Sequence, residues 1–152
     1  MNCPIDKVWE FYTDIKHLEI ITPREIDLKI TNSTSQKLTQ GSEIWLEGKI
    51  IPMFSKRSKW HSKISSYSVS SQQYLYEDEM LNGPFKKWRH LHKFDGVDND
   101  NNQMLTQVID EIHFELPCGI IGKLFDGYAY RRLEKLFCNR KLATIRALEN
   151  NT

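Results

Sequence analysis

The sequence predicts an α+β fold in which a curved antiparallel β-sheet wraps around a long C-terminal helix. Two short helical patterns open the chain, about six stretches of alternating apolar and polar residues follow, and a long helical pattern runs from about 123 to 149. Links of hairpin length favour antiparallel pairing of the strands. A helix of this length also needs a sheet face to cover its apolar side.

The N-terminal stretch predicts two short helices. The first is expected to begin near Asn2-Cys3-Pro4, because a proline in the first turn loses no hydrogen bond. Thr13 and Asp14 are expected to cap the second helix, which ends at Thr22-Pro23. The apolar stripe of the first helix is formed by Ile5, Val8, Trp9 and Tyr12.

Six strands are expected in the middle of the chain. Their approximate ranges are 26–31, 43–51, 56–66, 74–80, 88–94 and 104–116. Pro52 should end the second strand, and the turn-rich stretch 65–72 should follow the third. A loop of Asp, Asn and Gly is expected over 95–102.

The fifth predicted strand carries the most unusual pattern. Asn82-Gly83-Pro84 is a turn signal in which glycine is expected to supply a positive φ. The strand that follows alternates Trp88, His90, His92 and Phe94 with a charged face that holds Lys87, Arg89 and Lys93. Because the charged face should be the solvated one, two imidazoles are expected on the covered face between two aromatic rings.

Further polar and aromatic residues are expected on the same covered face. Strand parity places there Trp60, Tyr76, Asp78, Asp110 and Phe114. The apolar stripe of the C-terminal helix is formed by Phe125, Ala129, Leu133, Leu136, Ala143 and Ala147. Arg140 falls within this stripe and cannot lose its proton, so we expect it to pair with Asp78 or Asp110.

Four interpretations of the polar set Asp78, His90, His92, Asp110 and Arg140 are open. It could be a hydrogen-bonded network that fixes the register, or it could anchor the polar head of a ligand. It could bind a metal through His90, His92 and a carboxylate, but no third ligand is fixed by local spacing, so we expect no tightly held metal. It could also perform acid–base catalysis, with His90, His92 and Asp78 as the candidates.

Composition and motifs exclude several classes of function. A net charge of +1 gives no reason to expect a nucleic-acid partner, and no phosphate loop or nucleotide fingerprint points to a cofactor. No apolar run is long enough to span a bilayer. Cys3, Cys118 and Cys138 form no CxxC pair, so free thiols in the cytoplasm are expected. The remaining histidines, His17, His61 and His113, are expected on exposed faces.

Several motifs resemble the START-like (SRPBCC) superfamily of polyketide cyclases, pollen-allergen proteins and lipid-transfer domains. They are Pro4-Ile5-Asp6-Lys7-Val8-Trp9, then Asp78-x4-Gly83-Pro84-Phe85-x2-Trp88-x-His90-x-His92-x-Phe94, then Asp110 and Leu116-Pro117-x-Gly119. The resemblance covers essentially the whole chain and implies a helix-grip fold, with residues 1–152 as a single domain. A first strand precedes the first helix in this superfamily but is missing here, so we expect unpaired edges at strands 26–31 and 104–116.

The resemblance implies a cavity for a small hydrophobic ligand such as a lipid, isoprenoid, quinone or polyketide-like molecule. We favour binding or transport; the alternative is a cyclase or dehydratase that uses the histidines and aspartates of the cavity. The expected ligand-binding residues are Trp60, Tyr76, Asp78, Trp88, His90, His92, Phe94, Asp110, Phe114 and Arg140. The resemblance also leaves room for a fused or associated partner protein.

Overall fold

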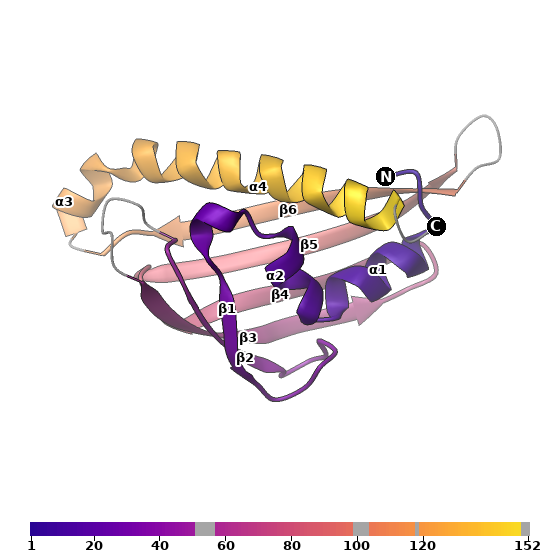
Figure 1. Cartoon of the computed structure of the whole chain (residues 1–152), viewed down its shortest axis with the longest axis horizontal. Coiled ribbons are helices and arrows are strands. Elements are labelled where there is room, and N and C mark those ends of the chain that lie inside the picture. Colours follow the sequence, from indigo (N-terminus) through magenta and orange to yellow (C-terminus); the bar gives the residue numbers. More distant parts are fainter. Residues whose placement is uncertain (51–56, 99–103, 118, 150–152) are drawn as a thin grey trace.

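The fold is one antiparallel sheet with helices on one face. The structure is a computed structural model, and it describes residues 1–50, 57–98, 104–117 and 119–149. Its strands pair in chain order from β1 to β6. The C-terminal helix α4 lies across the sheet, and α1 and α2 lie beside it on the same face (Figure 1).

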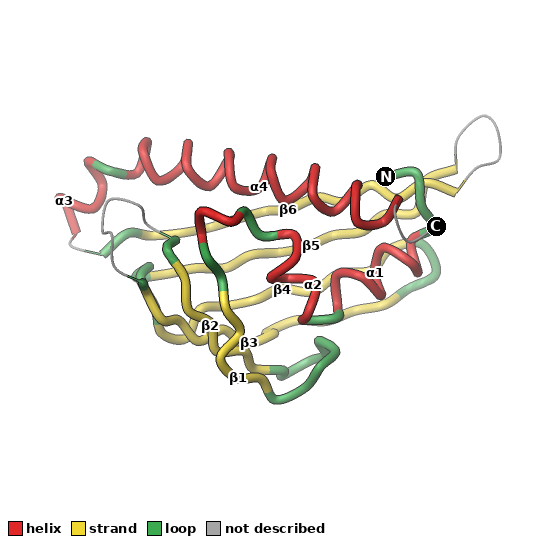
Figure 2. Tube along the Cα trace, in the orientation of Figure 1, coloured by secondary structure: helices red, strands yellow, loops and turns green. Residues whose placement is uncertain are grey.

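The observed elements confirm the predicted order of short helices, strands and long helix (Figure 2). The helices are α1 (Ile5–Thr13), α2 (Lys16–Ile21), the 3₁₀ helix η1 (Arg24–Ile26), α3 (Gly119–Leu124) and α4 (Asp126–Glu149). The strands are β1 (Lys29–Ser33), β2 (Glu43–Gly48), β3 (Ser58–Val69), β4 (Gln73–Asn82), β5 (Lys87–Asp98) and β6 (Met104–Glu115).

Several boundaries differ from the sequence prediction. The second strand ends at Gly48, and the fifth continues to Asp98 through the first half of the predicted loop 95–102. The first strand starts at Lys29, because η1 occupies Arg24–Ile26 and Asp27 adopts a left-handed conformation with φ 48°. The third strand continues to Val69, through the stretch predicted as a turn. Two register shifts in its pairing with β4 accommodate the irregular alternation of its residues. Phe125 precedes α4 and is 40% exposed, so it does not belong to the buried stripe.

Some predicted features cannot be compared with the structure. Ile51, Pro52, the second half of the predicted loop, over 99–102, and Cys118 lie outside the described residues.

Gly83 is required at the β4–β5 turn for a different reason from the predicted one. Its φ is not positive. Instead, a Cβ built on Gly83 would lie 2.6 Å from Cβ of Trp60 and 2.3 Å from Sδ of Met80. The absence of a side chain at this position therefore lets the turn approach β3 closely.

The two edges of the sheet are β1 and β6. The N-terminal residues contact the outer edge of β6. The amino group of Met1 donates to the carbonyl of Thr106 at 2.6 Å, and Thr106 N–H donates to the Met1 carbonyl at 2.9 Å. The Thr106 hydroxyl also donates to the carbonyl of Cys3. This backbone pairing satisfies polar groups that an edge strand would leave free.

The most tightly packed part of the core lies where α1 meets the sheet. Val8 and Phe94 are fully buried. The Trp9 ring contacts the rings of Tyr67, Tyr74 and Phe94 with centroids 5.1 to 5.3 Å apart. Each such side chain contributes roughly 1.5–3 kcal/mol by its burial, so this aromatic cluster fixes α1 on the sheet.

Within the described residues, no helix combines the length and the apolar character needed to cross a bilayer.

Candidate functional site

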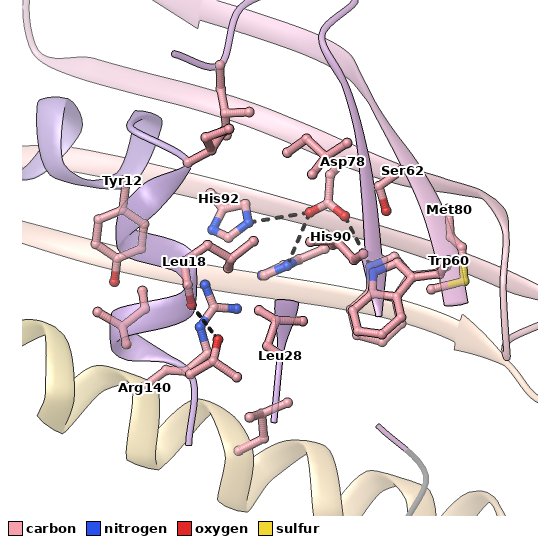
Figure 3. Close-up of a pocket in the computed structure, with 18 of the residues that line it drawn as sticks. Tyr12, Leu18, Leu28, Trp60, Ser62, Asp78, Met80, His90, His92 and Arg140 are labelled. Carbon is pink, nitrogen blue, oxygen red and sulfur yellow. Dashed lines mark hydrogen bonds and ion pairs between the residues drawn. The ribbon is translucent and has the colours of Figure 1, made fainter. Parts of the chain in front are cut away.

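A cavity of about 130 Å³ lies between the sheet and the helices (Figure 3). Most of the side chains around it are apolar, and they come from α1, α2, α4 and from strands β2 to β5. They include Leu18, Ile21, Leu28, Leu46, Trp60, Ile64, Leu133 and Phe137. A cavity of this order holds a molecule the size of a benzene ring.

The polar residues of the cavity region are positioned by the register of three strands. Asp78 on β4 is paired with His90 on β5, and His92 on β5 is paired with Asp110 on β6. Side chains two residues apart on a strand share a face, so both imidazoles point to the covered side. Each histidine is only 3% exposed, which confirms the predicted orientation.

Each imidazole lies between the same two carboxylates. Nδ1 of His90 is 3.4 Å from Oδ2 of Asp78, and its Nε2 is hydrogen-bonded to Oδ1 of Asp110 at 3.0 Å. Nε2 of His92 is 3.5 Å from Asp78 Oδ2, and its Nδ1 is 2.9 Å from Asp110 Oδ1. The two rings lie 3.7 Å apart. These four side chains form the His–Asp cluster.

Two further features complete the His–Asp cluster. The indole N–H of Trp88 donates to Oδ1 of Asp78 at 3.3 Å, so this carboxylate faces three N–H groups. Nδ1 of His92 is buried but is not aligned for a hydrogen bond with Asp110 despite the short distance. The cluster is therefore held mainly by charge and only partly by directed hydrogen bonds.

The electrostatics favour the charged form of the cluster. Burial alone would raise the pKa of Asp78 and of Asp110, but the hydrogen bonds from His90 and His92 outweigh it and hold both pKa values well below the usual range. Burial would likewise lower the pKa of His90. The hydrogen bonds to Asp110 and Asp78 outweigh this effect and raise the pKa of His90.

Asp78, His90 and His92 also offer three ligand atoms within 4.8 Å of one another, a set that could hold a metal ion. The third ligand that the sequence lacked is thus supplied by the neighbouring strand. However, a ring nitrogen binds a metal through its lone pair, whereas each carboxylate here favours a proton on the nitrogen that it faces. The absence of a tightly held metal stays a prediction.

The predicted pairing of Arg140 is wrong. Asp78 and Asp110 pair with the histidines instead. Among the residues that the structure describes, no carboxylate lies within ion-pair distance of the Arg140 guanidinium, which lies 5.2 Å from the ring centre of Phe137. The side chain extends from α4 into the cavity wall (Figure 3). Within the predicted polar set, the two histidines are thus the partners of both carboxylates.

Most of the predicted site residues line the cavity. They are Trp60, Tyr76, Asp78, Trp88, His90, His92 and Arg140. Phe94 lies in the aromatic cluster, Asp110 lies behind the imidazoles with its side chain 28% exposed, and Phe114 packs on Phe85. None of these three lines the cavity.

The sequence analysis missed part of the lining. His17 was expected to be solvated, yet it lines the cavity, stacks on Phe11 at 4.1 Å and bonds the Phe11 carbonyl through Nδ1. Tyr12, Leu133 and Leu136 belonged to predicted helical stripes but were not assigned to a site. The sequence signal for these three residues was the apolar stripe of each helix. A stripe predicts that a residue is buried but not whether it packs in the core or lines a cavity. His61 and His113 lie on the opposite face of the sheet, where His61 pairs with Glu43.

The fold was compared with solved structures. The protein TTHA0849 from Thermus thermophilus aligns over 100% of this chain and 94% of its own, with a TM-score of 0.65 and 10% identity. The ZhuI aromatase/cyclase from Streptomyces sp. R1128 aligns over 98% of this chain and 86% of its own, with a TM-score of 0.55 and 16% identity. The chain has the helix-grip fold.

The helix-grip assignment rests on structure alone. No family model matches the sequence, and a search of curated proteins finds no match. Identities of 10% and 16% show a shared architecture and carry no information about a shared reaction.

Proposed function

We propose that this helix-grip protein binds a small hydrophobic ligand in the cavity, with the apolar body against the sheet and helices and the polar end near His90, His92 and Arg140. The observation that carries the proposal is the cavity itself. An apolar wall with a few convergent polar groups is the usual composition of a small-molecule site.

The His–Asp cluster favours binding over catalysis. A general acid or base must have a nitrogen within hydrogen-bond reach of the reacting group. Here each nitrogen of His90 and His92 already faces Asp78 or Asp110. A substrate in the cavity would thus meet imidazoles whose nitrogens already face carboxylates, which supports a structural and anchoring role for the cluster.

Two measurements test the proposal. Native mass spectrometry of the protein purified from its own host should detect a bound small molecule. Isothermal titration calorimetry with benzyl alcohol and 1-hexanol, two neutral probes with small apolar bodies, should show saturable binding of at least one. Burial of an apolar body should give a negative heat-capacity change.

A matched pair of variants locates the site. Ser62 is buried in the cavity wall, so Ser62→Phe should fill the space and reduce probe affinity at least tenfold. Ser68 lies on the same strand and is exposed, so Ser68→Phe should leave affinity unchanged. Equal binding by both variants, or no binding of either probe to the unmodified protein, would contradict the proposal.

A further inference from the structure

The guanidinium of Arg140 is the cation of the cavity wall that lacks a carboxylate. The described part of the chain contains arginines with clear carboxylate partners, such as Arg57 with Asp27 and Glu47, and Arg89 with Glu77. Arg140 has none, although it is partly buried among apolar residues. A partly buried cation is costly in free energy unless an anion pairs with it. In the ligand-free protein, the charge of Arg140 is therefore unmatched.

The two aspartates near the cavity do not cancel this charge. Asp78 and Asp110 each face two imidazole nitrogens, and Asp78 also accepts the N–H of Trp88. Both carboxylates thus already face positively polarised groups. The group that remains for an incoming anion is the guanidinium of Arg140.

Two tyrosine hydroxyls add neutral donors to the same end of the cavity. Tyr12 and Tyr76 both line it, as does Arg140, and Tyr12 and Arg140 are labelled in Figure 3. Burial raises the pKa of both tyrosines, while the charge of Arg140 acts in the opposite direction on each. The hydroxyls thus stay protonated at neutral pH and can donate to an anionic oxygen.

We propose that the ligand is an acid, a hydrophobic molecule with a single carboxylate head that is bound by the guanidinium of Arg140. This inference rests on the proposed function and specifies its ligand class. A guanidinium offers two parallel N–H groups that match the two oxygens of a carboxylate. One arginine leaves the second charge of a phosphate monoester unmatched, which favours the carboxylate. The ligand body is small, since the cavity measures about 130 Å³.

The test compares probes that differ only in the head group. Benzoic acid, benzyl alcohol and benzylamine share one benzene ring, the size that the cavity holds, and are titrated into the protein by calorimetry at pH 7. The acid should bind roughly 10- to 100-fold more tightly than the alcohol, which is the usual strength of a charge-assisted hydrogen bond. The amine, a cation, should bind more weakly than the alcohol.

The variants assign the effect to one residue. Arg140→Gln should lower the affinity for the acid at least tenfold and leave that for the alcohol within about twofold. Arg146→Gln, an exposed position on the same helix, should leave both affinities unchanged. The alcohol affinity and the thermal unfolding curve show whether Arg140→Gln still folds and keeps its cavity.

The outcomes separate the two proposals. If acid and alcohol bind the unmodified protein equally, or if Arg140→Gln weakens both equally, the acidic ligand class is overturned while the hydrophobic site stands. If no member of the series binds, the acidic ligand class is overturned together with the proposed function.

Discussion

Two neighbouring regions of strand β5 bury their side chains in opposite ways, one with apolar contacts and the other with charged partners. Phe94 on β5 is fully buried among the rings of Trp9, Tyr12 and Tyr76. His92, two residues earlier on the same face, is 3% exposed and is held between two carboxylates. The aromatic cluster beneath α1 is packed without any charge, whereas the His–Asp cluster borders a cavity.

The difference follows from the helix that covers each region. Tyr12 and Trp9 on α1 bring large rings down onto the sheet, so space is filled by dispersion contacts. α4 brings Leu133, Leu136, Phe137 and Arg140 over the sheet, and a cavity remains beside them. Stability thus resides mainly under α1, and the polar chemistry resides under α4. Three predictions test this division.

The largest expected effect is on the aromatic cluster. Phe94→Ala should destabilise the protein by about 3–5 kcal/mol, because it removes a fully buried ring and leaves a cavity among its aromatic neighbours. Urea denaturation at pH 7 measures the change in the free energy of unfolding. Val97→Ala, at a position of β5 that is 42% exposed, is the control and should change it by less than about 0.5 kcal/mol. A loss below about 1 kcal/mol for Phe94→Ala would remove the cluster from its stabilising role.

The second prediction concerns the pH dependence of stability. The pKa values of Asp78 and Asp110 are lowered on folding, so their contribution is present above about pH 4 and is lost as the pH falls. The pKa of His90 is raised on folding, so its contribution is full below about pH 6.5 and is lost as the pH rises through the folded value. The cluster should therefore stabilise the protein most between these limits.

Two variants identify the source of the alkaline loss. Asp110→Asn should cost about 2 kcal/mol at pH 6 and should flatten the decline above about pH 6.5, because the buried His90 loses a charged partner. His61→Gln removes an imidazole from the opposite face and should leave the decline intact. A decline that persists in Asp110→Asn would show that other groups cause it.

The smallest expected effect is on Arg140. Its guanidinium has no carboxylate partner among the described residues, so Arg140→Leu removes an unmatched, partly buried charge and should raise the free energy of unfolding slightly, by up to about 0.5 kcal/mol. Arg57→Leu, which removes a guanidinium paired with Asp27 and Glu47, should be the more destabilising of the two. A loss of about 3 kcal/mol for Arg140→Leu would mean that this residue is paired after all.

Sequence alone was sufficient for the faces of the strands but not for their partners. The alternation of residues in β5 predicted that His90 and His92 are buried, because side chains two residues apart lie on the same face of a strand whatever its neighbours are. The pairing of Asp78 with His90 depends on the register of β4 against β5, and that of His92 with Asp110 on the register of β5 against β6. The alternation within one strand does not specify these registers, so the cluster could be proposed only as a set without geometry.

The error at Arg140 has a related cause. A charge on an apolar stripe predicts that some partner exists, but it does not rank the partners. His90 and His92 compete for the same carboxylates and are closer, since they lie on adjacent strands. His17 shows the same limit of sequence analysis at a residue that was expected to be exposed. Its place in the cavity depends on how α2 is set against the sheet, which the short helical pattern does not determine.

The close approach at Gly83 means that the size of the cavity can be adjusted from outside it. Trp60 and Met80, the two side chains that a Cβ at Gly83 would contact, both line the cavity, whereas Gly83 does not. Any larger residue there must push one of them aside, and no ligand need touch the altered residue. Ligand selectivity could thus diverge between related proteins through the turn while every residue of the binding surface stayed the same.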